Sequence, residues 1–286
     1  MPVKTILLPL AGATAPESVF ETTLSLARRF EAHLDVLYVR PNPRSLLPYA
    51  TLGLSKHMRE SVLEAAEQNA ESQSDSNRAL FASVCERMGV PFVSSRTGTD
   101  PYSASWEERT GQESAVLARR GRLSDLIVLP GPIPVSPPPE VAEAALKATG
   151  RPVLIIPEAA ETVIASNIGI GWNGSAESAR AVAAAMDYLH AAESVTIFSG
   201  TAHPEKRPTA EALVQYLGWH GVDATVQIFE AHDPSVGEAL LAQAKAIGVN
   251  LLVVGGYSRS RLRELILGGV TGHLLAKADI PIFMVH

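Results

Sequence analysis

The residues best suited to binding chemistry form a glycine-rich stretch near the C-terminus, residues 255–271. A glycine pair opens it, a basic stretch follows, and a second pair, Gly268 and Gly269, precedes a helical pattern that begins at Val270 and Thr271. Glycine has no Cβ, so such a loop lets the backbone N–H groups at a helix N-terminus approach a phosphate. The pattern therefore indicates a phosphate-binding loop, with a plain strand-to-helix connection as the alternative.

No other pattern in the sequence indicates a catalytic or metal site. There is no Gly-Lys-Ser/Thr phosphate loop and no Gly-x-Ser-x-Gly nucleophile elbow. The eight histidines are dispersed without metal-ligand spacing, so we expect surface or capping roles for them. No carboxylate or histidine can be assigned as a base for an attacking water, and we assign no catalytic residue.

Composition limits the class of protein. The chain has 286 residues, of which 46% are hydrophobic and 19% charged, enough for one large core or two ordinary ones. No apolar run approaches the roughly 20 residues that cross a bilayer. A net charge of −6 without a lysine- or arginine-rich block argues against general nucleic-acid binding. We expect a cytoplasmic protein without membrane or nucleic-acid partners, in which the single cysteine, Cys85, is a buried structural thiol.

Internal similarity divides the chain into two halves. Residues 4–12 resemble 166–174, residues 124–131 resemble 249–256, and residues 150–157 resemble 279–286. The first half carries extra residues in its middle but is four residues shorter between its last two strands. We expect domains at 1–158 and 162–286, with the linker in "PEAAETVIAS".

Each half alternates apolar, β-rich runs with helical patterns, which predicts an α/β fold of two tandem doubly wound, mostly parallel five-stranded sheets. In the first half the strands are expected at 6–10, 34–39, 92–94, 126–129 and 153–156. In the second half they are expected at 168–172, 195–198, 224–229, 251–254 and 282–285. The segments 175–192 and 233–248 have helical spacing, with Ser175 and Asp233 as N-caps.

The strand order, "WNGSAESARAV" and "GGYSRSRLRELILGGVTGHLL" together resemble the universal stress protein family in its tandem form, over nearly the whole chain. The resemblance implies ATP bound over the carboxyl ends of the strands. The family signature is glycine, two residues, glycine, nine residues, then glycine with serine or threonine. It falls here on Gly255, Ser258, Gly268 and Gly269, so two of its four positions have changed. The family's nucleoside-contacting aspartate falls on Asn173.

The changed positions alter the loop without abolishing its donors. Gly269 lacks a hydroxyl but keeps its amide, whereas a positive φ at Ser258 would be strained for any residue with a Cβ. Arg259 is the arginine we expect near the phosphates, and a solvated basic face is the alternative for it. The candidate cofactor-binding residues are Trp172, Asn173, Gly255, Ser258, Arg259, Gly268, Gly269, Val270 and Thr271.

The first half lacks the corresponding loop chemistry. Prolines replace glycines in "LPGPIPVSPPPEVAEAALKATG", and Ala11 holds the nucleoside-contacting position. Proline supplies no N–H, so we expect one nucleotide per chain, bound in the second half. Trp106 is interpreted as a packing residue.

The function expected from the resemblance is that of a stress-response protein that binds ATP, with or without Mg²⁺, and acts through its conformation or an unknown protein partner. Any ATP hydrolysis should be near background. The alternative is a nucleotide-free scaffold that keeps only the fold. The resemblance also implies that the last strands of the two halves meet as an intrachain pseudo-dimer, and that a homodimer can form.

Overall fold

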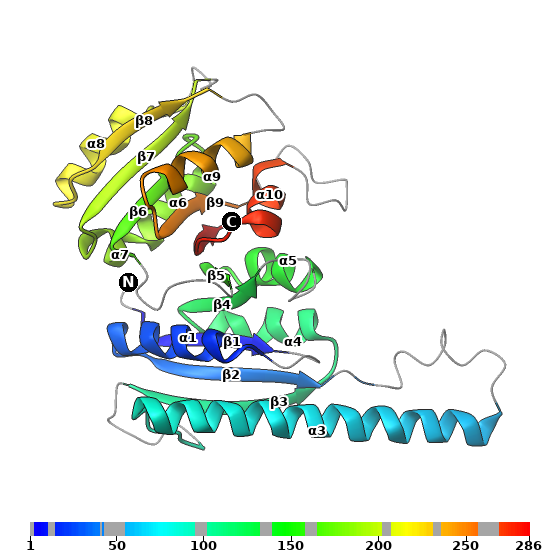
Figure 1. The fold of residues 1–286 in the computed structure, drawn as a ribbon. Helices are drawn as coiled ribbons and strands as arrows, with labels where there is room; N and C mark the ends of the chain where they lie inside the picture. Colours follow the sequence, from blue (N-terminus) through cyan, green and yellow to red (C-terminus); the bar gives the residue numbers. More distant parts are fainter. Residues whose placement is uncertain are drawn as a thin grey trace.

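The structure is a computed structural model that describes residues 3–10, 15–40, 42, 55–94, 102–131, 139–157, 165–201, 207–230, 236–256 and 269–286. Strands and helices alternate along the chain, and the helices cover both faces of a central sheet (Figure 1). None of the helices within these ranges combines the length and the apolar character that crossing a bilayer requires.

The elements of the first half are β1 (Thr5–Leu10), α1 (Glu17–Phe30), β2 (His33–Arg40), α3 (Lys56–Met88), β3 (Ser103–Thr110), α4 (Glu113–Arg120), β4 (Leu126–Gly131), α5 (Pro139–Ala148) and β5 (Val153–Pro157). Its strands other than β3 lie close to the ranges expected from the sequence. The second half contributes β6 (Asn167–Gly171), α6 (Ala176–Ala184), α7 (Met186–His190), β7 (Ser194–Gly200), α8 (Ala210–Trp219), β8 (Thr225–Phe229), α9 (Val236–Ala246), β9 (Leu251–Gly255), α10 (Gly269–Lys277) and β10 (Ile282–Val285).

The two expected five-stranded sheets join into one. The order is β3-β2-β1-β4-β5-β10-β9-β6-β7-β8, and neighbours are parallel except at the junction. There β5 and β10 pair antiparallel, with Ile155 opposite Ile282 and Val153 opposite Met284. The prediction that the last strands of the halves meet within one chain is confirmed.

Both halves fasten their first strand in the same way. The Asp125 carboxylate accepts hydrogen bonds from the backbone N–H groups of Lys4 and Thr5, each at 2.9 Å. At the matching position Asn250 accepts from Ser166 and Asn167 through its side-chain oxygen, at 3.1 and 2.9 Å. The similarity of the two halves in sequence thus extends to the bonds that hold the strands.

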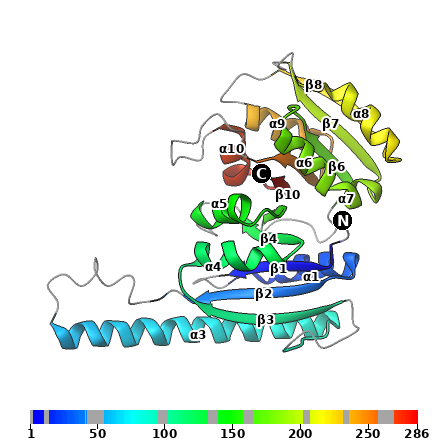
Figure 2. The same cartoon turned by 180° about the vertical axis from the view of Figure 1, so that it is seen from behind.

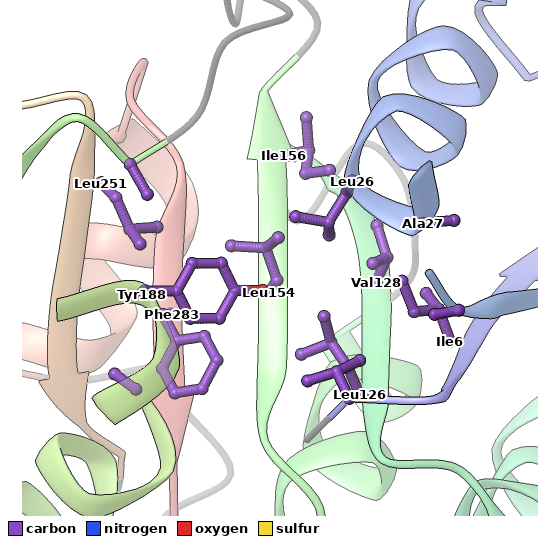
Figure 3. Packing of buried hydrophobic residues seen from close by; sticks show 14 of the residues in the cluster. Ile6, Leu26, Ala27, Leu126, Val128, Leu154, Ile156, Tyr188, Leu251 and Phe283 are labelled. Carbon is purple, nitrogen blue, oxygen red and sulfur yellow. The ribbon is translucent and has the colours of Figure 1, made fainter. Parts of the chain in front are cut away.

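The hydrophobic core runs across the junction (Figure 3). Leu154 of β5 lies beside Phe283 of β10 and Tyr188 of α7, and the two aromatic ring centroids are 5.5 Å apart. Phe30 of α1 meets Tyr188 edge-on at 4.9 Å, so a helix of the first half packs against one of the second. Since each buried side chain of this size contributes about 1.5–3 kcal/mol, the shared core fixes the halves together.

The sequence prediction of a strand at 92–94 is wrong. Phe92 makes only an isolated bridge to Ala104, and the third strand of the first half is β3. This strand is at the sheet edge and exposes Glu108 and Arg109, so its sequence lacks a continuous apolar run. Trp106 within it stacks on Tyr38 with centroids 5.6 Å apart, which confirms its packing role.

The extra residues of the first half include α3, which spans 33 residues. Its C-terminal part packs under the sheet and buries Phe81, Val84 and Cys85, while its N-terminal part projects past the sheet (Figures 1 and 2). Cys85 is 1% exposed, and burial raises the pKa of its thiol to about 11. The expectation of a buried structural thiol is confirmed.

A buried polar cluster between β2 and β3 corrects the surface or capping role expected for His33. Its Nδ1 lies 2.8 Å from Ser103 Oγ, and its Nε2 lies 3.1 Å from Asp35 Oδ1. Ser105 and Arg120 donate hydrogen bonds to Asp35 at 2.6 and 2.9 Å. Burial raises the pKa of Asp35, but its polar neighbours outweigh burial and lower it to about 2.

Candidate functional site

The described candidate residues gather at one edge of the second half, where β6 and β9 end and α6 and α10 begin. Parallel strands present their carboxyl ends at the same edge, and the helices that follow turn their N-termini toward it. Backbone N–H groups and the positive ends of helix dipoles are therefore placed there for an anion.

The turn after β6 is built by its own side chains. Asn173 is exposed and accepts a hydrogen bond from the N–H of Ser175 through Oδ1, at 3.0 Å. Ser175 caps α6 by accepting from the N–H of Ser178 at 3.1 Å, which confirms the capping role expected for it. Because Oδ1 accepts this hydrogen bond within the turn, the fold itself orients the Asn173 amide.

Trp172 packs in the hydrophobic core next to this turn. Its ring belongs to the hydrophobic core and is 7% exposed, while its Nε1–H donates to the backbone oxygen of Pro208 at 2.9 Å. That bond holds the segment before α8 beside the turn. Trp172 therefore positions the turn, and its expected role in binding stays a prediction.

Arg207 was not singled out from the sequence. Its guanidinium donates to the backbone oxygen of Asn173 at 3.2 Å and so brings a cation to this edge. It lies on a connection far from the glycine-rich segment, and only the fold brings the two regions to the same edge. A basic residue just after the second strand of the half was the available signal.

Gly255 has a packing reason to be glycine. A Cβ there would lie 2.5 Å from the backbone nitrogen of Ser178 and 2.8 Å from the carbonyl carbon of Glu177. The end of β9 therefore lies directly against the first turn of α6. This close approach brings the end of β9 and the start of α6 together at the site.

A carboxylate stands at the start of α6. Burial raises the pKa of Glu177, but hydrogen bonds to its own backbone N–H and to Ser175, with the charge of Arg180, hold it below its usual value. The Arg180 guanidinium lies 3.1 Å from Glu177 and also donates to the backbone oxygen of His286 at 3.0 Å. Arg180 thereby balances the negative charge of Glu177.

The start of α10 keeps the features expected of an anion-binding helix. Gly269 has φ +74°, no described atom lies within 4 Å of the place that a Cβ would take, and the first turn of α10 contains no acidic residue. Val270 packs closely on α9, where a Cβ on Gly237 would come within 3.3 Å of its Cα. Val270 and Thr271 are thus held in place at the helix N-terminus. Ser258, Arg259 and Gly268, and the capping residue Asp233, lie outside the described residues.

The matching edge of the first half is acidic. Glu140 lies in the first turn of α5, and Glu113 lies in the first turn of α4. Burial, with the nearby charge of Glu140, raises the pKa of Glu113 to about 7. Just before α1, the N–H of Ala15 donates to the buried Asn77 of α3 at 2.9 Å. An anion at this edge would meet carboxylates.

The described residues of the second half therefore fit an anionic nucleotide, with Gly269, Thr271 and Arg207 placed at the edge and no acidic residue in the first turn of α10. Among the residues that the structure describes, no group of three or more histidine, cysteine, aspartate or glutamate side chains could hold a metal ion.

Comparison with known proteins identifies a family match in the second half. Residues 165–286 match the family model described as the universal stress protein family. A segment of 76 residues is 36% identical to the stress response protein NhaX of Bacillus subtilis, over 27% of this chain and 43% of that protein. The chain thus spans under half the length of that relative.

Solved structures share the fold across the whole chain. A universal stress protein from Archaeoglobus fulgidus superposes with a TM-score of 0.70 at 15% identity, covering 98% of this chain and 97% of that one. A functionally unknown protein from Pseudomonas aeruginosa gives 0.57 at 14% identity, over 99% and 92%. Residues 165–286 match the universal stress protein family, and they lie in a chain whose fold over its full length is that of a solved universal stress protein.

Proposed function

We propose that this chain is a cytoplasmic stress-response protein that binds one ATP at the carboxyl edge of its second half and acts through the conformation or partner that the bound state favours. The two units are 1–158 and 162–286. The observation that carries the proposal is the contrast between the helices at the two edges: α10 opens on Gly269 with no acidic first turn, whereas α5 opens on Pro139 and Glu140.

The groups around the edge have distinct roles in this proposal. The amides of Gly269, Val270 and Thr271 bind phosphate oxygens, and Ser258, Arg259 and Gly268 complete the loop. Asn173 meets the nucleoside, and Arg207 supplies positive charge beside it. Mg²⁺, where present, would be carried by the phosphates, since it commonly binds through substrate phosphates with few protein ligands.

Calorimetric titration with ATP tests the proposal through a matched pair of variants. Gly269→Asp adds a Cβ and a negative charge at the phosphate position, and it should weaken binding about 100-fold, equivalent to about 2.7 kcal/mol. Gly89→Asp is the control, because Gly89 also has a positive φ (+64°) and open space but caps the far end of α3. Equal binding by both variants would remove the proposed site.

Release of adenine nucleotide on acid extraction of the purified protein should agree with the titration. Wild-type protein that neither carries nor binds ATP would leave the nucleotide-free scaffold as the function. Phosphate release under saturating ATP and Mg²⁺ should stay near background, because no described residue serves as a base for water. Turnover of about 1 s⁻¹ or more, lost in Gly269→Asp, would make the protein an enzyme.

A further inference from the structure

The sheet ends in two outer strands whose free edges are built differently (Figure 2). At one end β3 carries Glu107 and Arg109, and residues 91–93 bond to Ala104 alongside it. At the other end β8 reads Thr-Val-Gln-Ile-Phe, with no charge, no proline and no described segment beside it. Charges and covering segments are the usual protection of sheet edges, and β8 has neither.

The backbone of β8 has free hydrogen-bonding groups at its outer edge. The N–H of Thr201, just past β7, donates to the backbone oxygen of Phe229 at 3.1 Å, so Phe229 turns its backbone groups toward β7. Backbone direction alternates along a strand. Val226 and Ile228 therefore turn their N–H and C=O groups outward.

Apolar surface accompanies these groups. Ile228 is 54% exposed, and Trp219 at the end of the flanking helix α8 is 90% exposed. The two elements that carry them, β8 and α8, form the outermost end of the second half (Figures 1 and 2). On the opposite face of β8 the Gln227 amide donates to Gln243 of α9 at 2.5 Å, so this face of the strand is held against α9.

We propose that β8 pairs antiparallel with β8 of a second copy of this chain, about a symmetry axis through Gln227. Val226 of each copy then faces Ile228 of the other, and each such pair exchanges two backbone hydrogen bonds. Thr225 faces Phe229 without backbone hydrogen bonds, because both residues turn these groups toward β7. The strand can pair with itself because it carries no charged residue, so no like charges meet.

Self-complementarity identifies a second copy as the occupant. A closed dimer with one symmetry axis requires the same patch on both partners, and an antiparallel β8 pair meets that condition. The contact continues the existing sheet, and it places the apolar side chains of Val226 and Ile228 over the same face as the core beneath α8.

Light scattering during size-exclusion chromatography tests the dimer with the full chain. Wild-type protein should elute with the mass of two chains at about 50 µM, and Ile228→Lys should weaken the dimer at least tenfold, about 1.4 kcal/mol. Ile247→Lys is the control, since Ile247 is 40% exposed but lies at the end of α9. A monomeric wild type, or equal behaviour of the two variants, would overturn the proposal.

Disulfide crosslinking tests the register and does not depend on Ile228→Lys folding. Gln227 would face its own copy as a non-hydrogen-bonded pair with Cα atoms about 4.5 Å apart, within disulfide range. Gln227→Cys should therefore form a covalent dimer on mild oxidation, whereas Thr225→Cys on the same strand should not. Cys85 is 1% exposed and gives little background. Absence of the Gln227→Cys dimer, or equal crosslinking at Thr225, would contradict this pairing.

Discussion

Pro130 and Gly255 hold matching positions near the ends of β4 and β9, and they differ in the space that their side chains fill. In the second half α6 lies so close that a Cβ on Gly255 would stand 2.5 Å from a backbone nitrogen. In the first half a buried proline ring occupies the same place. The glycine thus permits the close approach of α6 to β9, and the first half has a proline ring at the matching position.

The difference continues in the helices that close each edge. α10 begins with a glycine of positive φ and no acidic first turn, whereas α5 begins with Pro139 and Glu140. The halves share strand order and the fastening of their first strands by Asp125 and Asn250. Both halves therefore keep the scaffold, and the proposed function assigns the anion site to the second half alone.

The largest effect is expected from filling the gap at Gly255. In Gly255→Ala the new methyl group would overlap the backbone of Ser178 and force α6 away from β9. The free energy of unfolding should fall by about 3 kcal/mol, and nucleotide binding should fall with it. Gly200→Ala at the end of β7, with nothing within 4 Å of the new Cβ, should change it by less than about 0.5 kcal/mol. Urea unfolding of both variants measures the difference, and equal stabilities would show that the close approach is not required.

A second contrast lies where β2 meets β3 and β7 meets β8. The first half has the buried charged cluster around Asp35, while the second half has Thr196 and Thr225, whose hydroxyls lie 3.4 Å apart. In Asp35→Asn the His33 ring and Arg120 no longer have a carboxylate as hydrogen-bond partner. The free energy of unfolding at pH 7 should therefore fall by about 2–3 kcal/mol. Thr196→Val, the control in the other half, should change it by about 1 kcal/mol or less.

The pH dependence of this cluster follows from the lowered pKa. Asp35 titrates at 3.8 when unfolded and at about 2 when folded. Its contribution is therefore present above about pH 4 and is lost as pH falls toward 2. Acid unfolding of the wild type should be steeper in this window than that of Asp35→Asn. Parallel curves would show that Asp35 titrates alike in the folded and unfolded states.

The positions of most strands were readable from the sequence because buried parallel strands are apolar at nearly every position. β3 was missed for the converse reason: an edge strand that carries Glu107, Glu108 and Arg109 gives no such run. The length of α3 was not predicted either, because its projecting part has no buried face to mark it.

The candidate site could be located from its glycines, but the reasons for them could not. Gly255 looked like part of a binding loop, and its contact with α6 appears only when strand and helix are packed. Arg207 and the buried role of His33 arise from contacts between distant segments. Spacing along the chain does not report such contacts.

A smaller effect is expected at the acidic edge of the first half. The pKa of Glu113 is raised from 4.5 to about 7 in the folded protein by burial and then by the charge of Glu140. A raised acid pKa means that the folded state loses stability as pH rises from about 4.5 to 7. Glu113→Gln should therefore gain about 1–2 kcal/mol above pH 7 and almost nothing below pH 4.5. Glu238→Gln in the first turn of α9 is the control and should show no such pH-dependent gain. Thermal melts of both variants across this pH range measure the gain. A gain in Glu113→Gln that is the same at every pH would contradict the assignment.

The last prediction is that the number of nucleotides bound per chain does not change. Glu113→Gln combined with Glu140→Gln removes the carboxylates at the starts of α4 and α5, and it tests whether their charge alone prevents binding there. We expect ATP stoichiometry to stay at one per chain, with the dissociation constant within about twofold of wild type, or about 0.4 kcal/mol. Proline has no backbone N–H, and the segment that leads into α5 has proline at 132, 134, 137, 138 and 139. This segment therefore lacks N–H donors that a phosphate needs. Neutralising nearby acids does not restore them. Calorimetry that found a second site in the double variant would show that the carboxylates, and not the prolines, separate the two halves.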